Sequence, residues 1–122
     1  MYDGNRVMVS PGGDGKVYVV IDNQKCYIPD NPTSGNLWAD NDAIQHLTKQ
    51  QFDEISTGAA LSVGAVLATA IHDDGVFLVT GKQKRHIHSP ETFKKYGFNK
   101  NVIFNKVPKI IMDNVPSGPE IT

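Results

Sequence analysis

The first third of the chain contains runs of β-branched and aromatic residues separated by turn-forming ones. Residues 6–10 and 16–21 form two such runs on either side of a Pro-Gly-rich segment, a pattern that predicts a β-hairpin. Asp22-Asn23 is a turn dipeptide, so a third strand is expected over residues 24–28. The sequence therefore predicts a three-stranded meander at the start of the chain.

The same pattern returns 59 positions later. Val17-Tyr18-Val19-Val20 falls on Val76-Phe77-Leu78-Val79, and the run from Gln24 to Pro29 falls on the run from Gln83 to His88 without a gap. After one inserted residue the match resumes and continues to Gly118. Apolar positions match apolar positions and turn residues match turn residues, which indicates an internal duplication.

Helix signals follow the strands in the second half. The turn Thr80-Gly81 is expected to lead into a strand over residues 83–87. Ser89 is a good N-cap, and Gly97 can end a helix in the left-handed conformation. We therefore expect a helix over residues 90–96.

A further helix is predicted near the end of each half. Residues 48–51 have the pattern of a capping box, flanked by Leu47 and Phe52 as a hydrophobic staple, so this helix should extend to about Ser56. Its counterpart starts at Pro108 and spaces its apolar residues for one buried face, namely Ile111, Met112 and Val115.

These elements predict an α+β fold made of two tandem pseudo-symmetric β-β-β-α-α units, residues 1–59 and 60–122. A unit of about sixty residues is only marginally able to bury its own apolar face. We therefore expect the two units to share one core, so that residues 1–122 form a single domain.

The second half also resembles a short tandem repeat of bacterial secreted and cell-surface proteins. The resemblance lies in the aromatic strand at 75–79, the Gly-Lys-rich segment at 81–87, and Thr92-Phe93 in the helix that follows. The first half keeps the Ile28-Pro29 step but has Leu37-Trp38 in place of Thr92-Phe93. The resemblance implies an accessory or recognition module, secreted or at the cell surface, and brings no chemistry with it.

Charge and composition narrow the classes of function. The formal net charge is −1 and no basic face is clustered, so nucleic acid is not expected as a partner. The single cysteine, Cys26, cannot form an internal disulfide and is predicted to be a partly buried structural thiol. No apolar run approaches the length of a membrane span, and the N-terminus lacks the pattern of a signal peptide.

Histidines and acidic residues give only weak metal signals. His86 and His88 lie two apart on one face of a strand, and His72 would add a third ligand. Ile87 between them is expected to point inward, which leaves the two histidines at the solvent. The acidic residues at 40–42 and 73–74 lack the spacing of a calcium loop. No metal and no cofactor are therefore expected.

The candidate binding site is the outward face of the third strands with the irregular segments that follow them. Aromatic and polar side chains of this kind stack on and hydrogen-bond to sugars or peptides. The residues are Lys25, Tyr27, Trp38, Lys84, His86 and Tyr96. In the alternative interpretation, Trp38 and Tyr96 fill the core beside Leu37 and Phe98.

We therefore expect a non-catalytic recognition module that binds a carbohydrate or a cell-surface polymer through two related sites, whose duplication adds avidity. The alternative is a structural or protein-interaction domain of a larger bacterial or phage assembly. The expected partners are accordingly a glycan, a protein or a second copy of the chain as a homodimer. An enzyme is not expected, because no motif places a nucleophile on a strained turn beside a base.

Overall fold

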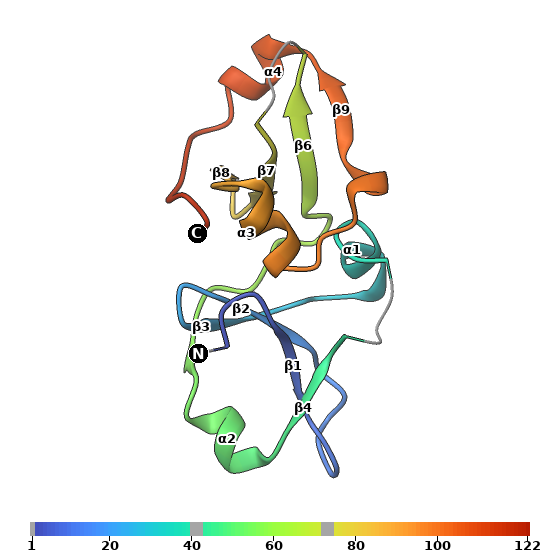
Figure 1. Cartoon of the computed structure of the whole chain (residues 1–122), viewed down its shortest axis with the longest axis vertical. Helices are drawn as coiled ribbons and strands as arrows, with labels where there is room; N and C mark the ends of the chain where they lie inside the picture. Colours follow the sequence, from blue (N-terminus) through green and yellow to red (C-terminus); the bar gives the residue numbers. More distant parts are fainter. Residues whose placement is uncertain (1, 40–42, 72–74) are drawn as a thin grey trace.

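The computed structural model describes residues 2–39, 43–71 and 75–122. Within these residues the fold is mixed α+β, with one sheet and two of the four α-helices in each half of the chain. Figure 1 shows the two sheets as separate layers, one in the lower and one in the upper part of the molecule. The α+β prediction is confirmed at this level.

The first sheet contains five strands in the spatial order β4-β1-β2-β3-β5. Neighbours β1, β2 and β3 are antiparallel, as expected of a meander, whereas β4 runs parallel to β1 and β5 runs parallel to β3. The strands are β1 (Arg6–Val9), β2 (Tyr18–Ile21), β3 (Gln24–Tyr27), β4 (Gln45–Leu47) and β5 (Ser56–Thr57).

The second sheet has the order β8-β7-β6-β9, with β9 parallel to β6. A parallel bridge between Lys84 and Ser117 lies where β5 lies beside β3 in the first sheet. The halves therefore share an order of elements, while their origin as copies of one unit stays a prediction. The strands are β6 (Val66–Ala70), β7 (Phe77–Thr80), β8 (Gln83–His86) and β9 (Phe104–Val107).

The α-helices are all short. In Figure 1, α2 and α4 lie at the two opposite ends of the molecule, and α1 and α3 lie nearer its middle. A 3-10 turn, η1 (Lys100–Val102), connects α3 to β9. The helices are α1 (Asn31–Gly35), α2 (Lys49–Asp53), α3 (Pro90–Lys95) and α4 (Lys109–Asp113).

The predicted order β-β-β-α-α is wrong in one respect, because strands stand between and after the helices. β4 pairs along β1 with Gln45 and His46 exposed and only Leu47 buried. β9 likewise presents an exposed edge, so neither strand has the alternation of a half-buried strand. Both strands are defined by the neighbour with which they pair rather than by their own pattern.

The turn between the second and third strands is a tight two-residue loop in each half. Asp22 and Asn23 both have positive φ, 54° and 61°. Gly81 and Lys82 take the same conformation at 62° and 63°, so the second loop lies one residue beyond the predicted Thr80-Gly81. Two consecutive positive φ angles are the signature of a type I′ hairpin turn.

The predicted caps are confirmed. Thr48 and Gln51 form the capping box of α2, Ser89 accepts the backbone N–H of Thr92 at the start of α3, and Gly97 has φ +68°. The predicted apolar face of α4 is wrong, because Met112 is buried but Ile111 is exposed. Met112 is the buried residue of this helix, and Val115 lies beyond its last residue, Asp113, and is half-buried.

Helix α1 has no counterpart among the stated predictions. Asp30 is its N-cap and accepts the backbone N–H of Thr33 at 2.8 Å. Hydrogen bonds from Thr33 lower the pKa of Asp30. Thr33 is buried, as is Thr92 in α3, 59 positions further on.

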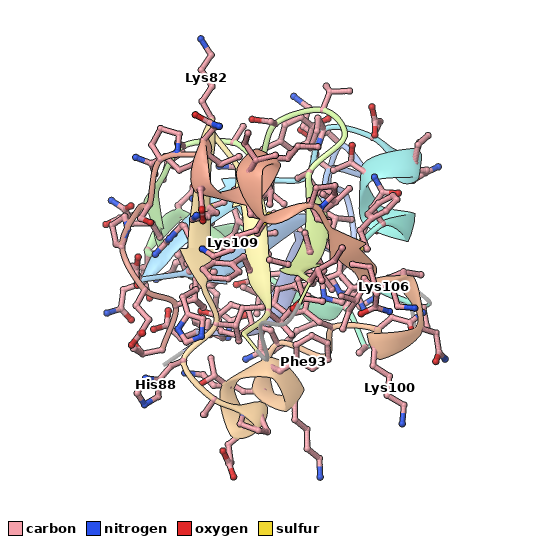
Figure 2. The ribbon with its side chains drawn as sticks, turned by 90° about the horizontal axis from the view of Figure 1, so that it is seen from above. Lys82, His88, Phe93, Lys100, Lys106 and Lys109 are labelled. Carbon is pink, nitrogen blue, oxygen red and sulfur yellow. The ribbon has the colours of Figure 1, made fainter. Side chains whose placement is uncertain are left out.

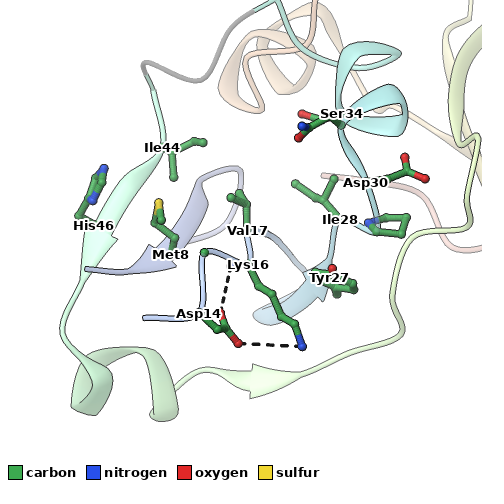
Figure 3. A pocket seen from close by; sticks show the side chains of 13 residues that line it. Met8, Asp14, Lys16, Val17, Tyr27, Ile28, Asp30, Ser34, Ile44 and His46 are labelled. Carbon is green, nitrogen blue, oxygen red and sulfur yellow. Dashed lines mark hydrogen bonds and ion pairs between the residues drawn. The ribbon is translucent and has the colours of Figure 1, made fainter. Parts of the chain in front are cut away.

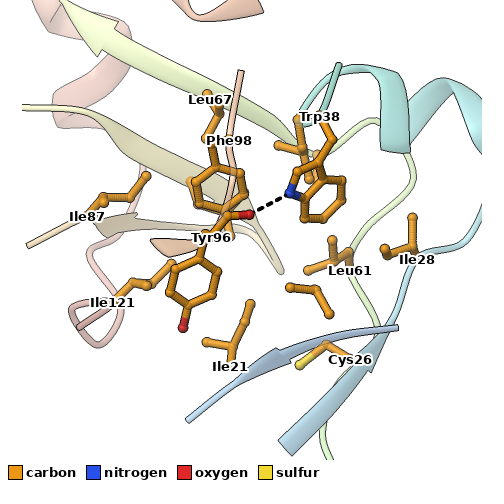
Figure 4. Close-up of a cluster of buried hydrophobic side chains, with 14 residues drawn as sticks. Ile21, Cys26, Ile28, Trp38, Leu61, Leu67, Ile87, Tyr96, Phe98 and Ile121 are labelled. Carbon is orange, nitrogen blue, oxygen red and sulfur yellow. Dashed lines mark hydrogen bonds between the residues drawn. The ribbon is translucent and has the colours of Figure 1, made fainter. Parts of the chain in front are cut away.

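One hydrophobic cluster draws on both halves of the chain, and Figure 4 shows it between the two sheets. Trp38 is 3% exposed, and its indole N–H donates to the backbone carbonyl of Tyr96 at 2.9 Å. Its ring stacks on Phe98, with centroids 5.6 Å apart. The buried members are Val19, Ile21, Cys26, Ile28, Leu37, Trp38, Leu61, Ala65, Leu67, Leu78, Ile87, Tyr96, Phe98 and Ile121.

The opposite face of each sheet has its own smaller cluster. Val20 points away from the shared core and packs with Leu47 under Phe52 of α2. In the second sheet, Ala68 points away from the shared core and packs with Met112 of α4. The alternation of neighbours along a strand thus places α2 and α4 on the outer faces.

We expect Trp38→Ala to lower the free energy of unfolding by about 4 kcal/mol, because it removes a buried ring and its hydrogen bond. Trp38→Phe keeps an aromatic ring but leaves the Tyr96 carbonyl without its donor, and should cost about 2 kcal/mol. Urea unfolding followed by far-ultraviolet circular dichroism measures both. A loss below about 1 kcal/mol for Trp38→Ala would contradict its place in the core.

Candidate functional site

Two of the six predicted site residues belong to the core. Trp38 and Tyr96 are 3% and 2% exposed, so neither ring offers a face to a ligand. Burial raises the pKa of the Tyr96 hydroxyl well above its usual value, with the Asp3 and Asp22 carboxylates adding to the shift. The alternative interpretation of these two aromatic residues, as core residues, is the one that the structure supports.

Lys25 and Lys84 each donate to a carbonyl of an outer helix; Lys25 is buried and Lys84 is half-buried. Lys25 is 6% exposed; its ammonium donates to the Phe52 carbonyl at 2.9 Å and lies 4.0 Å from the centroid of that ring. Lys84, 59 positions later, donates to the Met112 carbonyl at 2.6 Å. Burial under α2 takes Lys25 out of the predicted binding face, whereas Lys84 is half-buried and lines a hollow beneath α4, so its role in binding stays a prediction. Each lysine donates to a carbonyl at the end of its helix.

Tyr27 lines a groove in the first half, with a volume of about 810 Å³. Apolar side chains from β1, from the residues just before β2 and just after β3, and from the segment before β4 form its floor. Figure 3 shows Met8, Val17, Ile28 and Ile44 around it. Polar groups border it, including the exposed pair Asp14 and Lys16, whose charged atoms lie 4.0 Å apart. Further lining residues are Pro29, Asp30, Asn31, Ser34 and His46.

His86 lines a smaller groove in the second half, with a volume of about 340 Å³. The floor is again apolar, formed by Val76, Ile87, Phe93 and Ile103. In Figure 2, His88, Phe93 and Lys100 lie along one side of the molecule. Further lining residues are Gly75, His88, Ser89, Pro90 and Lys100.

The two grooves occupy matching positions along the chain. Every residue that lines the second groove, apart from Lys100, lies 59 positions after a residue that lines the first. The offset pairs Ile44 with Ile103 and Tyr27 with His86. The floors share apolar residues at three matched positions and differ where Phe93 stands in place of Ser34, and the rims differ as well.

His86 and His88 share one acidic partner. Their Nδ1 atoms lie 3.1 Å and 2.8 Å from the two carboxylate oxygens of Glu120. These hydrogen bonds lower the pKa of the Glu120 carboxyl. The backbone of Ile121 pairs with the same strand, since His88 N–H donates to its carbonyl and its N–H donates to the His86 carbonyl. The histidines thus fasten the C-terminal segment beside β8.

The described residues contain no group of three histidine, cysteine or acidic side chains arranged to hold a metal ion. His72 and the acidic residues 40–42 and 73–74 lie outside those residues. Cys26 is buried, and burial raises the pKa of its thiol, as expected of a structural cysteine rather than a nucleophile.

Sequence reasoning missed most of the groove residues. Ile44, Ile103, Asp30 and Phe93 line the grooves, yet none belonged to the predicted site. A sequence signal for two of them was present. Ile44 and Ile103 lie 59 positions apart and are both apolar, although neither belongs to a predicted helix or strand, where buried apolar residues are expected. Of the predicted residues, Tyr27 and His86 line these two grooves, and Lys84 lines a separate hollow of about 370 Å³ beneath α4.

Comparisons with known proteins add little. No protein family model and no curated protein matches the chain. A solved structure of the periplasmic assembly from the ESX-5 inner membrane complex aligns with 97% of this chain and 35% of that chain, with 14% identity and a TM-score of 0.35. Such a likeness carries no argument about function. Among residues 2–39, 43–71 and 75–122, no helix has the length and apolar character of a membrane span.

We expect Lys25→Ala and Lys84→Ala each to lower the free energy of unfolding by about 2 kcal/mol, because a helix-end carbonyl loses its charged donor. Lys94→Ala on α3, where the lysine is exposed, is the matched control and should change it by less than about 0.5 kcal/mol. Urea titrations of the three variants give the comparison. Equal losses at Lys25 and Lys94 would contradict a role for Lys25 in fastening α2.

Proposed function

We propose that this chain is a non-catalytic protein-recognition module, of the kind that docks a partner within a larger assembly. The observation that carries the proposal is the second groove, whose floor consists of aliphatic and aromatic side chains. Ligand pockets with a few polar groups around an apolar floor accept an apolar group and orient it by the rim.

The floor of the second groove suits an anchor side chain of a protein. Ile87 is buried beneath it, and Val76, Phe93 and Ile103 are half-buried, so each keeps some apolar surface for a ligand to cover. Its volume of about 340 Å³ fits one or two large side chains. An aliphatic or aromatic residue of the partner would bury this surface from water.

The rim favours an acidic residue next to that anchor. Lys100 is exposed at the edge of the groove, and His88 lies on the rim with its ring already held by Glu120. A carboxylate beside the anchor would meet the Lys100 ammonium. The proposed ligand is therefore a protein segment with an apolar anchor and a neighbouring Asp or Glu.

Carbohydrate binding is the second candidate, and the first groove is the feature that favours it. Tyr27 is half-buried there with the Lys16 ammonium 5.6 Å from its ring centroid, and Asp30 and Asn31 supply polar groups nearby. One aromatic ring beside polar side chains is a surface on which a sugar can stack. Burial of Trp38 and Tyr96 leaves this site with fewer rings than the sequence predicted, so we place it second.

We also infer that the two grooves are copies of one ancestral site, in two tandem pseudo-symmetric units at 1–59 and 60–122. The common offset of their linings and the matching contacts of Lys25 and Lys84 support this inference. Two unequal sites on one chain would give avidity toward a partner that reaches both.

Selection of a phage-displayed random peptide library on the intact protein tests the proposal. We expect enriched peptides to share a large apolar residue beside Asp or Glu. Lys100→Glu should weaken their binding about tenfold. Phe93→Ser, which installs the residue found at the matched position Ser34, should abolish it.

Lys82→Glu serves as the charge control, because Figure 2 shows Lys82 at the opposite side of the molecule from Phe93 and Lys100. If no sequence family is enriched, or if Lys82→Glu and Lys100→Glu weaken binding equally, the protein-recognition proposal fails. The same proteins on a glycan array test the second candidate, for which binding must be lost in Tyr27→Ala.

A further inference from the structure

Helix α4 exposes two large apolar side chains at the end of the molecule. Ile110 and Ile111 are 73% and 56% exposed, whereas Met112 packs into the cluster beneath the helix. Figure 2 looks down on this end and shows Lys109 of the same helix near the centre of the view. At 100° per residue, Met112 points inward and Ile110 points almost directly away from the sheet.

The matching helix of the first half, α2, makes the same ion pair and the same lysine contact but carries polar residues on its outer side. Lys49 and Asp53 of α2 form an ion pair at 2.6 Å, and Lys109 and Asp113 of α4 form one at 3.0 Å. Phe52 and Met112 are the residues whose carbonyls accept a lysine ammonium. Between these shared positions α2 carries Gln50 and Gln51, where α4 carries Ile110 and Ile111. The apolar surface of α4 is therefore not a requirement of the fold.

We propose that α4 is a self-association surface, on which a second copy of this chain docks through the same helix in antiparallel orientation. This inference goes beyond peptide recognition at the grooves and uses none of their residues. The argument rests on how three rows of side chains along α4 meet their own copies.

A twofold axis perpendicular to the plane of two antiparallel helices brings each edge of one helix against the same edge of the other. The central row then places Ile110 against Ile110 of the copy. The edge that carries Ile111 lies against the Ile111 edge of the copy. On the other edge the order of charges is reversed, so Lys109 faces Asp113 of the copy and Asp113 faces its Lys109. Every row of α4 is thus complementary to itself.

One further exposed apolar side chain, Ile71, lies beside the chain that leads into α4 and would extend the contact. Ile71 follows β6, and its N–H donates to the carbonyl of Val107 just before α4. Phe104 is also exposed, but at the start of β9, the end of the strand away from α4. Lys106 has φ 61° and the register of β9 against β6 shifts beside it, so this edge is irregular. The contact would therefore be made by side chains rather than by continued strand pairing.

The size of the surface sets the expected strength. A five-residue helix with a few neighbouring side chains covers less than the roughly 800 Å² per partner of a standard interface. We expect a weak dimer, with a dissociation constant on the order of 100 µM.

Sedimentation equilibrium of the intact chain over a concentration series tests the proposal. Wild type should pass from monomer to dimer, and Ile110→Gln with Ile111→Gln should remain monomeric throughout. These substitutions install the residues of α2, and glutamine is at least as good a helix former as isoleucine. Circular dichroism of the variant checks that the fold is retained.

Charge variants test the antiparallel geometry itself. Lys109→Asp places like charges at both contacts of the charged edge and should weaken the dimer about tenfold. The double variant Lys109→Asp with Asp113→Lys restores opposite charges at both contacts and should recover wild-type association. Lys49→Asp on α2 is the matched control and should leave the dimer unchanged.

A chain that stays monomeric at millimolar concentration would overturn the proposal, as would a dimer that survives Ile110→Gln with Ile111→Gln. Failure of the double charge variant to recover association would overturn the antiparallel arrangement. None of these outcomes depends on whether peptides bind the second groove.

Discussion

The indole N–H of Trp38 reaches the backbone carbonyl of Tyr96 across 58 positions of sequence, and the core of the molecule forms around this contact. The Trp38 ring stacks on Phe98, which in turn stacks on Tyr96 with centroids 5.4 Å apart. Leu37 lies beside it and its carbonyl accepts the N–H of Asn99, so hydrogen bonds run in both directions between the halves. Half of a chain of this length has little interior of its own, and the two sheets depend on the cluster that both build.

This shared core decides where binding surfaces can exist. The inner face of each sheet is covered by the other half of the chain, and much of the outer face is covered by α2 or α4. Lys25 and Lys84 donate hydrogen bonds to carbonyls of these two helices. The two matched grooves lie at the ends of the third strands, and a further hollow of about 370 Å³ lies between α4 and the second sheet. The remaining convex surface includes the outer side of α4, where nothing in the fold requires Ile110 and Ile111 to be apolar. Recognition at the grooves and association through α4 therefore use separate parts of the molecule.

The sequence predicted the elements that local chemistry determines. Turn residues and β-branched runs predicted the meanders, and caps predicted α2 and α3, because each of these signals acts within a few residues. β4 and β9 were missed because each is specified by pairing with a distant strand, and polar residues such as Gln45 and His46 carry no mark of it. The same limit applied to the site. Lys25 and Trp38 look like exposed binding residues in sequence, but only the fold reveals that helix ends and the opposite half surround them.

Native-state hydrogen exchange on the intact chain, measured at increasing concentrations of urea below the unfolding transition, is the sharpest test of a core built by both halves. If the two halves unfold as one cooperative unit, the slowest amides of β2 and β3 and those of β7 and β8 will share one free energy of opening and one dependence on urea. Two separate free energies, with one sheet opening while the other stays protected, would contradict the account and show that each half folds on its own.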